Sequence, residues 1–207
     1  LNFSFLNTFC FTFLNKKVVV TGFGPFRCFK TNISSESVRI LPEHFRNDSF
    51  LSKNVDLNIL VDIPVAYKPV DEFVENIWKN IKPDYVIHVG LHSYAKVLCL
   101  EKCAFNGPYS DVDVNNCECE NSLQCCIVNG HECLHTNIDL ENLKNHLESL
   151  GIESAISENP GLFLCGYIYY NSLSHSKNTL FIHVPSNYKR SETAEILKRI
   201  ITYLVQL

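Results

Sequence analysis

The chain has 207 residues, of which 46% are hydrophobic and 19% are charged, an ordinary balance for a soluble globular protein. This length allows one domain with a sizeable core, or at most two small ones. The formal net charge is −4 and no Lys- or Arg-rich run is present, which excludes a nucleic-acid surface.

The N-terminal residues 1–15 are uncharged and rich in Phe and Leu. This segment is too short and too interrupted by polar residues to span a bilayer, so no membrane partner is expected. It also lacks the basic region and the small-residue cleavage site of a signal peptide. We interpret residues 1–15 as an atypical leader or a translated upstream stretch, and expect one folded domain over residues 16–207.

Ten cysteines are present in the chain. Disulfide frameworks usually serve secreted chains that are too small to build a core. This chain is long enough to build one and shows no convincing secretion signal. The sequence therefore predicts a reduced, cytoplasmic protein.

The first half of the domain alternates between strand and helix patterns. Residues 17–23 form a compact β-branched run that ends in a glycine-rich turn, as a buried strand does. Asn32 is a candidate N-cap for a helix over residues 35–41 that stops at Pro42. Another strand lies within residues 57–65, and apolar residues at helical spacing predict a helix over residues 70–81.

The second half continues the same alternation. The predicted elements are strands over 85–90 and 96–102, an irregular stretch from 106 to about 133, a helix over 140–150, a strand over 152–157, a helix after Pro160, a strand over 180–184 and a helix over 192–205. Alternation of this kind predicts a single α/β layered domain with a largely parallel sheet.

Cys165 and His183 are the candidate nucleophile and base. Pro160 and Gly161 stand where the second-half helix should begin, which places Cys165 in an early turn. A helix N-terminus lowers the pKa of a thiol through its unpaired N–H groups and its dipole. His183 ends a strand, where α/β sheets place reactive groups. The alternative, that Cys165 is a small core hydrophobe, stays open on spacing alone.

Glu101 is a candidate for the group that orients this histidine. It lies on an apolar strand, where a carboxylate is costly unless it is paired. Pairing with His183 explains its position. An ion pair with Lys102 or an exposed strand end explains it equally well.

The turn TGFGPF, residues 21–26, does not fit a nucleotide loop, because it lacks both a third glycine at the Rossmann spacing and a GK[ST] sequence. Phe23 and Phe26 suit the wall of an apolar pocket with free backbone groups nearby. Tight packing of both rings into the core is the alternative.

The cysteines between residues 117 and 133 suggest a zinc site at first sight. Structural zinc sites prefer paired C-x₂₋₄-C sequences, whereas this segment has CxC followed by CC, so no metal site is predicted. Free thiols in a loop are the preferred interpretation. His88 and His92 lie at a strand end and are interpreted as core and loop histidines.

Taken together, these segments resemble pyroglutamyl-peptidase I, the pyrrolidone-carboxylate peptidase family of cysteine peptidases. The motifs occur in family order from residue 16 to about 204. They are VVVTGFGPF (18–26) with Asn32, DIPVAY (62–67), HVG (88–90), LEKCAFN (100–106), LQCC (123–126), the Cys165 segment with YY at 169–170, and IHVP (182–185).

The resemblance implies a fold and a set of site residues. The implied fold is a single-domain three-layer α/β/α sandwich around a twisted, largely parallel sheet. Cys165 matches the nucleophile, His183 the general base and acid, and Glu101 the third catalytic residue. Phe23 and Phe26 match aromatic residues that hold the lactam ring, and Asn32 belongs to the same motif and is taken as substrate-binding.

The implied activity is that of a cysteine omega-peptidase that removes N-terminal pyroglutamate from small peptides, with no metal or organic cofactor. Three departures from the family pattern concern rate and specificity: Gly166 replaces the usual Asn or Asp, Leu162 and Pro160 change the helix start, and residues 92–94 replace a smaller turn. Two alternatives follow, a catalytically silent pyroglutamyl-peptide-binding protein and a zinc-stabilised interaction module. The sequence gives no oligomeric state.

Overall fold

The computed structural model describes residues 15–26, 30–119, 121 and 123–207. The interpretation of residues 1–15 concerns a segment that lies, except for residue 15, outside this range. Within the described residues a six-stranded sheet has the order β2-β1-β3-β8-β4-β7. Its strands are β1 (Lys16–Phe23), β2 (Val55–Ile63), β3 (Tyr85–His92), β4 (Leu98–Glu101), β7 (Ser154–Ser157) and β8 (Thr179–Pro185).

The sheet is largely parallel, as predicted. Strands β2, β1, β3 and β8 pair in parallel, whereas β4 pairs with β8 in antiparallel register and with β7 in parallel. A separate two-stranded antiparallel sheet joins β5 (Cys103–Phe105) to β6 (Cys133–His135). Both strands are only three residues long, too short to give a periodic signal, and the sequence did not predict this sheet.

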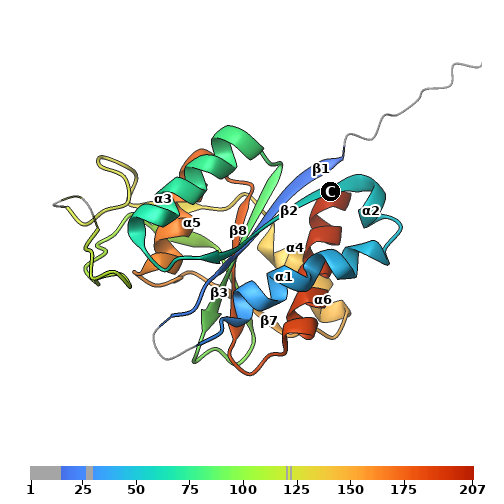
Figure 1. The fold of residues 1–207 in the computed structure, drawn as a ribbon. Helices are drawn as coiled ribbons and strands as arrows, with labels where there is room; N and C mark the ends of the chain where they lie inside the picture. The colour runs from blue at the N-terminus through green and yellow to red at the C-terminus, as the bar shows by residue number, and fades with distance from the viewer. Residues whose placement is uncertain (1–14, 27–29, 120, 122) are drawn as a thin grey trace, which may run out of the picture.

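Helices cover both faces of the main sheet (Figure 1). One face carries α1 (Ile33–Arg46), α4 (Leu140–Ser149) and α6 (Arg190–Gln206), with the short α2 (Leu51–Asn54) at its side. The other face carries α3 (Tyr67–Asn76), its π-helical continuation η1 (Ile77–Ile81) and α5 (Leu164–His175). The predicted three-layer α/β/α sandwich is therefore confirmed.

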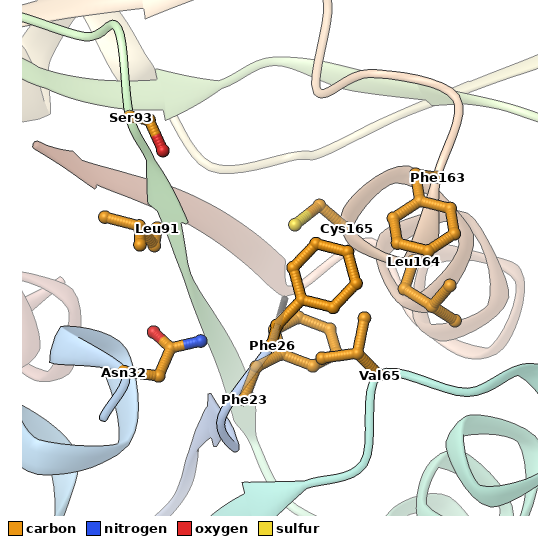
Figure 2. Close-up of a pocket in the computed structure, with 9 residues that line it drawn as sticks. All are labelled: Phe23, Phe26, Asn32, Val65, Leu91, Ser93, Phe163, Leu164 and Cys165. Carbon is orange, nitrogen blue, oxygen red and sulfur yellow. The ribbon is translucent and has the colours of Figure 1, made fainter. Parts of the chain in front are cut away.

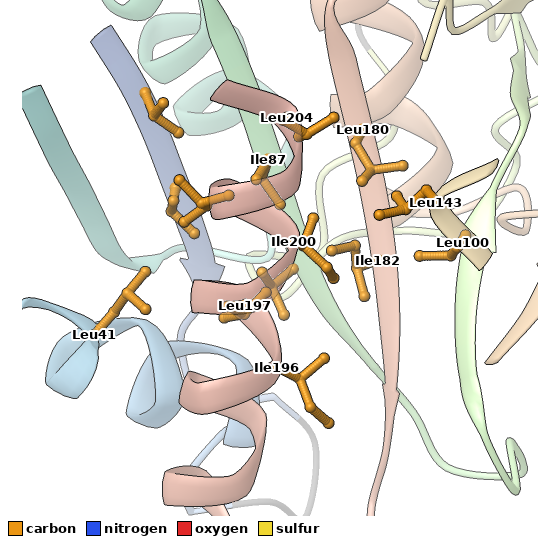
Figure 3. Packing of buried hydrophobic residues seen from close by; sticks show 14 of the residues in the cluster. Leu41, Ile87, Leu100, Leu143, Leu180, Ile182, Ile196, Leu197, Ile200 and Leu204 are labelled. Atoms are coloured by element: carbon orange, nitrogen blue, oxygen red, sulfur yellow. The ribbon is translucent and has the colours of Figure 1, made fainter. Parts of the chain in front are cut away.

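Strand alternation decides which side chains meet which helices. Val18 and Val20 of β1 enter the core beneath α1 and α6, while Val19 between them packs against Ile77 on the opposite face. Figure 3 shows α6 lying over the strands, with Leu197 and Ile200 directed into this core. Both are fully buried.

Helix α1 does not stop at Pro42, which corrects the prediction from the sequence. Proline inside a helix costs about 3 kcal/mol because it removes a donor and crowds the preceding turn. Leu41 and Phe45, on either side of Pro42, are both buried in the core. Burying two such side chains is worth roughly 3–6 kcal/mol, which is enough to carry the helix through to Arg46.

Helix α3 begins earlier than its apolar spacing predicts. The backbone N–H of Tyr67, the first residue of α3, donates to Asp113 Oδ2 at 3.2 Å. Asp113 is buried and also accepts hydrogen bonds from the backbone N–H groups of Asn115 and Cys117. One carboxylate therefore caps α3 and organises the irregular stretch between β5 and β6.

None of the helices in the described part of the chain is both long enough and apolar enough to cross a membrane.

Candidate active site

His183 and Glu101 point to the same face of the sheet because of strand alternation. On β8, Leu180, Ile182 and Val184 enter the core beneath α6, so Phe181 and His183 face the α5 side. On β4, Leu98 and Leu100 enter the same core as Ile182. The antiparallel pairing sets Cys99 opposite His183 and Glu101 opposite Phe181, which makes Glu101 a diagonal neighbour of His183.

The two side chains form a buried hydrogen-bonded pair. Nδ1 of His183 lies 2.7 Å from Oε1 of Glu101, and the exposed fractions of the two side chains are 5% and 1%. An ionised carboxylate can only accept, so Nδ1 carries the proton and donates it. This fixes the ring orientation and leaves Nε2 for another partner.

That partner is Cys165, whose thiol is within hydrogen-bonding reach of His183. Burial by itself lowers the pKa of His183, but hydrogen bonds and charge at Cys165 and Glu101 outweigh burial and raise the pKa from 6.5 to about 9. His183 can therefore hold a positive charge at neutral pH between two groups that are able to be anionic.

Cys165 occupies the first turn of α5, where the sequence placed it. Its sulfur packs over Gly90, since a Cβ on Gly90 would lie 3.2 Å from Sγ and 2.7 Å from the ring of Phe181. Gly90 is the register partner of His183 in the pairing of β3 with β8. The absence of a side chain at Gly90 therefore lets the thiol sit above β3, beside the neighbouring strand β8 that carries His183.

No side chain caps the N-terminus of α5, where Phe163 is the N-cap residue. The first N–H groups of a helix have no partner within the helix and together form a site for negative charge. Cys165 is in this turn, so the same groups can face its sulfur or an oxyanion that forms beside it.

Gly166 is packed tightly against the segment that leads into α5. A Cβ at this position would lie 2.1 Å from the backbone oxygen of Gly161, closer than any real contact. The Asn or Asp that the resemblance leads one to expect here has no room in this conformation. Gly161 itself has a φ of +82°, in the left-handed region that favours glycine.

A cavity of about 190 Å³ opens beside Cys165. Figure 2 shows Phe23 and Phe26 together on one wall, Asn32 and Leu91 across from them, and the Cys165 sulfur directed into the space. The lining is mostly apolar and consists of Phe23, Phe26, Asn32, Val65, Leu91, Ser93, Phe163, Leu164 and Cys165. The structure thus brings the predicted pocket residues Phe23, Phe26 and Asn32 to the predicted nucleophile.

Asn32 holds the turn that carries the two phenylalanines. It is the predicted N-cap of α1: its Oδ1 accepts hydrogen bonds from the backbone N–H of Ser34 at 3.1 Å and from the Ser34 hydroxyl at 2.8 Å. Its Nδ2 donates to the backbone oxygen of Gly24 at 3.0 Å. The amide therefore ties the glycine turn to the helix, and it lines the cavity at the same time.

Several lining residues were not identified from the sequence. Phe163 makes a tilted ring contact with Phe26, with 5.5 Å between centroids. Its place two residues before Cys165 was the available signal. Val65 lies in the DIPVAY segment, and Leu91 follows the HVG strand. Ser93, from the turn that departs from the family pattern, does border the pocket.

His88 follows the sequence interpretation as a core histidine, whereas His92 is the last residue of a strand and not a loop residue. His88 is fully buried, its Nδ1 lies 2.8 Å from the hydroxyl of Thr21, and burial lowers its pKa to about 3. It is therefore a neutral core residue. His92 lies at the end of β3, and its ring meets that of His183 edge-on with 5.3 Å between centroids.

A model of the pyroglutamyl peptidase family matches residues 16–191. The chain is a pyroglutamyl peptidase family member. It is 35% identical over 199 residues to human pyroglutamyl-peptidase 1, covering 93% of this chain and 91% of the human protein. The pyrrolidone-carboxylate peptidase of Pyrococcus furiosus is 31% identical, with 82% of this chain and 80% of that protein covered.

Solved structures support the pyroglutamyl peptidase fold. A variant of the pyrrolidone carboxyl peptidase from Pyrococcus furiosus superimposes with a TM-score of 0.78 at 26% identity, covering 92% of this chain and 98% of that chain. The family and the enzyme class predicted from the sequence are therefore confirmed: the chain is a cysteine-type pyroglutamyl peptidase of the hydrolase class.

Proposed function

We propose that this pyroglutamyl peptidase cleaves with Cys165 as nucleophile, His183 as general acid and base, and Glu101 as the carboxylate that orients and charges His183. The observation that carries the proposal is the buried His183–Glu101 pair, with its free nitrogen toward the thiol at the edge of an aromatic cavity. Nucleophile, base and orienting group are the three parts that activated-thiol catalysis requires.

In the proposed reaction, the thiolate of Cys165 attacks the carbonyl carbon of the bond after pyroglutamate, and the carbonyl oxygen becomes an oxyanion. N–H groups in the first turn of α5 stabilise that charge. His183 gives its proton to the departing amine as the carbon–nitrogen bond breaks, which leaves a thioester on Cys165. Water then attacks the thioester, His183 accepts a proton, and free pyroglutamate and the thiolate are regenerated.

The cavity supports the choice of substrate. Pyroglutamate is small, cyclic and uncharged, and aromatic and aliphatic side chains form most of the pocket wall. A charged N-terminal amine in the same pocket would lose its hydration without an acidic partner among the lining residues. The natural partners proposed are therefore small peptides with N-terminal pyroglutamate.

The thiol chemistry supports a cytoplasmic location, where reducing conditions keep Cys165 active. Eight cysteines in the described residues are free thiols. The proposed reaction draws on side chains and water, with no step assigned to a cofactor.

The test is release of a fluorogenic amine from a pyroglutamyl conjugate under reducing conditions, with wild type compared with Cys165→Ala. Turnover should vanish in Cys165→Ala and persist in Cys117→Ser, which removes an exposed thiol that does not line the cavity. A prolyl conjugate, which lacks the lactam carbonyl, should not be cleaved. Binding of the pyroglutamyl conjugate by folded, reduced wild type without turnover would instead indicate a silent binding protein.

A further inference from the structure

A second cluster of reactive side chains lies outside the cavity, on the two-stranded sheet. The sulfur atoms of Cys103 and Cys133 and a ring nitrogen of His135 all lie within 4.8 Å of one another. Cys103 is buried, Cys133 is half-buried and His135 is exposed. The cluster can therefore be reached from solvent through His135.

Strand geometry explains why these three side chains converge. Cys103 is the register partner of His135, and Cys133 is two residues before His135 on the same strand. Successive side chains alternate between faces, so all three project from one face. Ala104 and Leu134 project from the other face and pack into the core beside α5.

We propose that Cys103, Cys133 and His135 form a zinc-binding site. Two thiolates and one imidazole are a ligand set that zinc prefers, with a water molecule able to complete a tetrahedron. The atom separations are close to those of ligands around one ion, because zinc–sulfur and zinc–nitrogen bonds are about 2.0–2.3 Å long. Binding displaces one proton from each thiol, so two protons are released for each zinc bound.

A disulfide fits the same atoms less well. Cys103 and Cys133 are diagonal neighbours across the strand pair, because Cys133 pairs with Phe105. Diagonal positions lie roughly 7–8 Å apart, beyond the usual Cα span of a disulfide. An ion between the two sulfurs bridges this span without moving either strand.

The residues around the cluster link it to the strand that carries Glu101. Cys103 Sγ donates to the backbone oxygen of Glu158 at 3.4 Å, and the Glu158 carboxylate pairs with Lys102 at 2.7 Å. β5 begins two residues after Glu101, and the Tyr169 hydroxyl donates to the backbone oxygen of Glu101 at 2.7 Å. Zinc would therefore tie β6 to the end of the strand that presents Glu101.

This site differs from the zinc module considered from the sequence. Within the described part of the chain, Cys133 is the one member of the 117–133 cysteine cluster that joins a group with metal-ligand spacing. Cys103 and His135 complete it from outside that cluster. Periodicity could not identify the set, because 29 residues separate Cys103 from Cys133 along the chain.

The test uses full-length reduced protein in which Cys165→Ala removes the thiol of the active site, so that zinc cannot bind there. Zinc stoichiometry and affinity are measured against a chromophoric chelator, and cobalt is used as a spectroscopic substitute. We expect one zinc per chain, sulfur-to-cobalt charge-transfer absorption, and a higher unfolding temperature with zinc.

Variants locate the ligands. In the Cys165→Ala background, Cys133→Ser and His135→Ala should each weaken zinc binding by more than the roughly 10- to 100-fold that loss of an outer partner costs. Cys117→Ser removes an exposed cysteine that is not one of the three proposed ligands, so it should leave the zinc affinity unchanged. His135 is exposed, so His135→Ala should fold normally. Absence of stoichiometric zinc, or unchanged affinity in both cluster variants, would overturn the proposal.

Discussion

Glu101 is an unusual residue for a buried strand, and its surroundings show what offsets its cost. Its Oε1 is bonded to His183, while Oε2 has no hydrogen-bond partner among the described residues. A buried carboxylate with one unsatisfied oxygen is costly unless a cation neutralises it. The raised pKa of His183 supplies that cation at neutral pH. The role of Glu101 is therefore to stabilise the protonated imidazole of His183.

Replacing the carboxylate by an amide tests this role. Glu101→Gln keeps the shape and one acceptor but removes the negative charge that stabilises the imidazolium. We expect kcat on a pyroglutamyl conjugate to fall by about 10²- to 10⁴-fold, the range that acid–base groups contribute. The control is Glu158→Gln, which removes an exposed carboxylate paired with Lys102 and should leave kcat unchanged. Wild-type kcat in Glu101→Gln would contradict the assignment.

The pH profile tests the same pair independently. The pKa of His183 is raised to about 9, so the ring keeps its proton through neutral pH and loses it as the pH rises through 9. Activity should therefore fall on the alkaline side with an apparent pKa near 9, which belongs to the coupled Cys165–His183–Glu101 system. The protonated ring makes its whole contribution to folding stability below pH 6.5, and this contribution is lost as the pH rises through about 9.

The measurement is kcat/KM between pH 5 and 10. Glu101→Gln removes one cause of the raised pKa of His183, so its alkaline limb should move to lower pH. An alkaline limb at the same pH in both proteins would show that another group controls it.

Helix α5 shows where the sequence was informative and where it was not. The prediction that Cys165 lies in an early turn came from Pro160 and Gly161, which are local signals, and it holds although α5 begins only at Leu164. The closeness of Gly166 to the Gly161 oxygen depends on how the lead-in segment folds back, which no periodicity reports. The glycine at position 166, which differs from the family pattern, is thus the residue that this backbone conformation accommodates.

Gly166→Ala has two opposing effects on stability, higher helix propensity and a steric clash with Gly161, and the clash should be the larger. Alanine favours a helix interior over glycine by about 1 kcal/mol. A methyl group 2.1 Å from the Gly161 oxygen requires the backbone to move, and overpacking of this kind costs about 1–3 kcal/mol. We expect lower stability to urea and a raised KM, since the displaced segment carries Phe163.

The control is Ser174→Ala, an exposed position on the same helix. This change should alter stability by at most a few tenths of a kcal/mol and leave KM unchanged. A stabilised Gly166→Ala protein with normal KM would show that helix propensity, and not the contact with Gly161, dominates.

At the scale of the whole molecule, the sequence predicted those elements that leave a local pattern in the chain. Strand 17–23 and helix 192–205 were found because β-branched runs and helical apolar spacing are local. The reversed direction of β4 was not found, because strand direction depends on pairing partners distant in sequence. The end of α1 was missed because Leu41 and Phe45 gain more from burial than Pro42 costs. Local sequence also left open whether Glu101 pairs with His183 or with Lys102. The antiparallel register of β4 and β8 decides this in favour of His183.

One face of the sheet carries the α6 core and the other carries the site residues, and one substitution can test whether the two are independent. Leu197 of α6 is fully buried in the core that faces away from Cys165 (Figure 3). Leu197→Ala should lower the free energy of unfolding by about 2–5 kcal/mol, through lost burial and the cavity left behind. The site residues Phe23, Phe163 and Cys165 belong to the opposite cluster, so kcat/KM per folded molecule should not change.

Urea unfolding and active-site titration on the same preparations provide both quantities. Leu207→Ala, at an exposed position, should match wild type in each. A Leu197→Ala protein that stays folded but shows a lower kcat/KM or a shifted alkaline limb would mean that the α6 core sets the position of His183. Strands β8 and β4 offer a route for that coupling, because Ile182 and Leu100 enter the α6 core while their neighbours His183 and Glu101 face the site. The independence of the two faces would then fail at these strands.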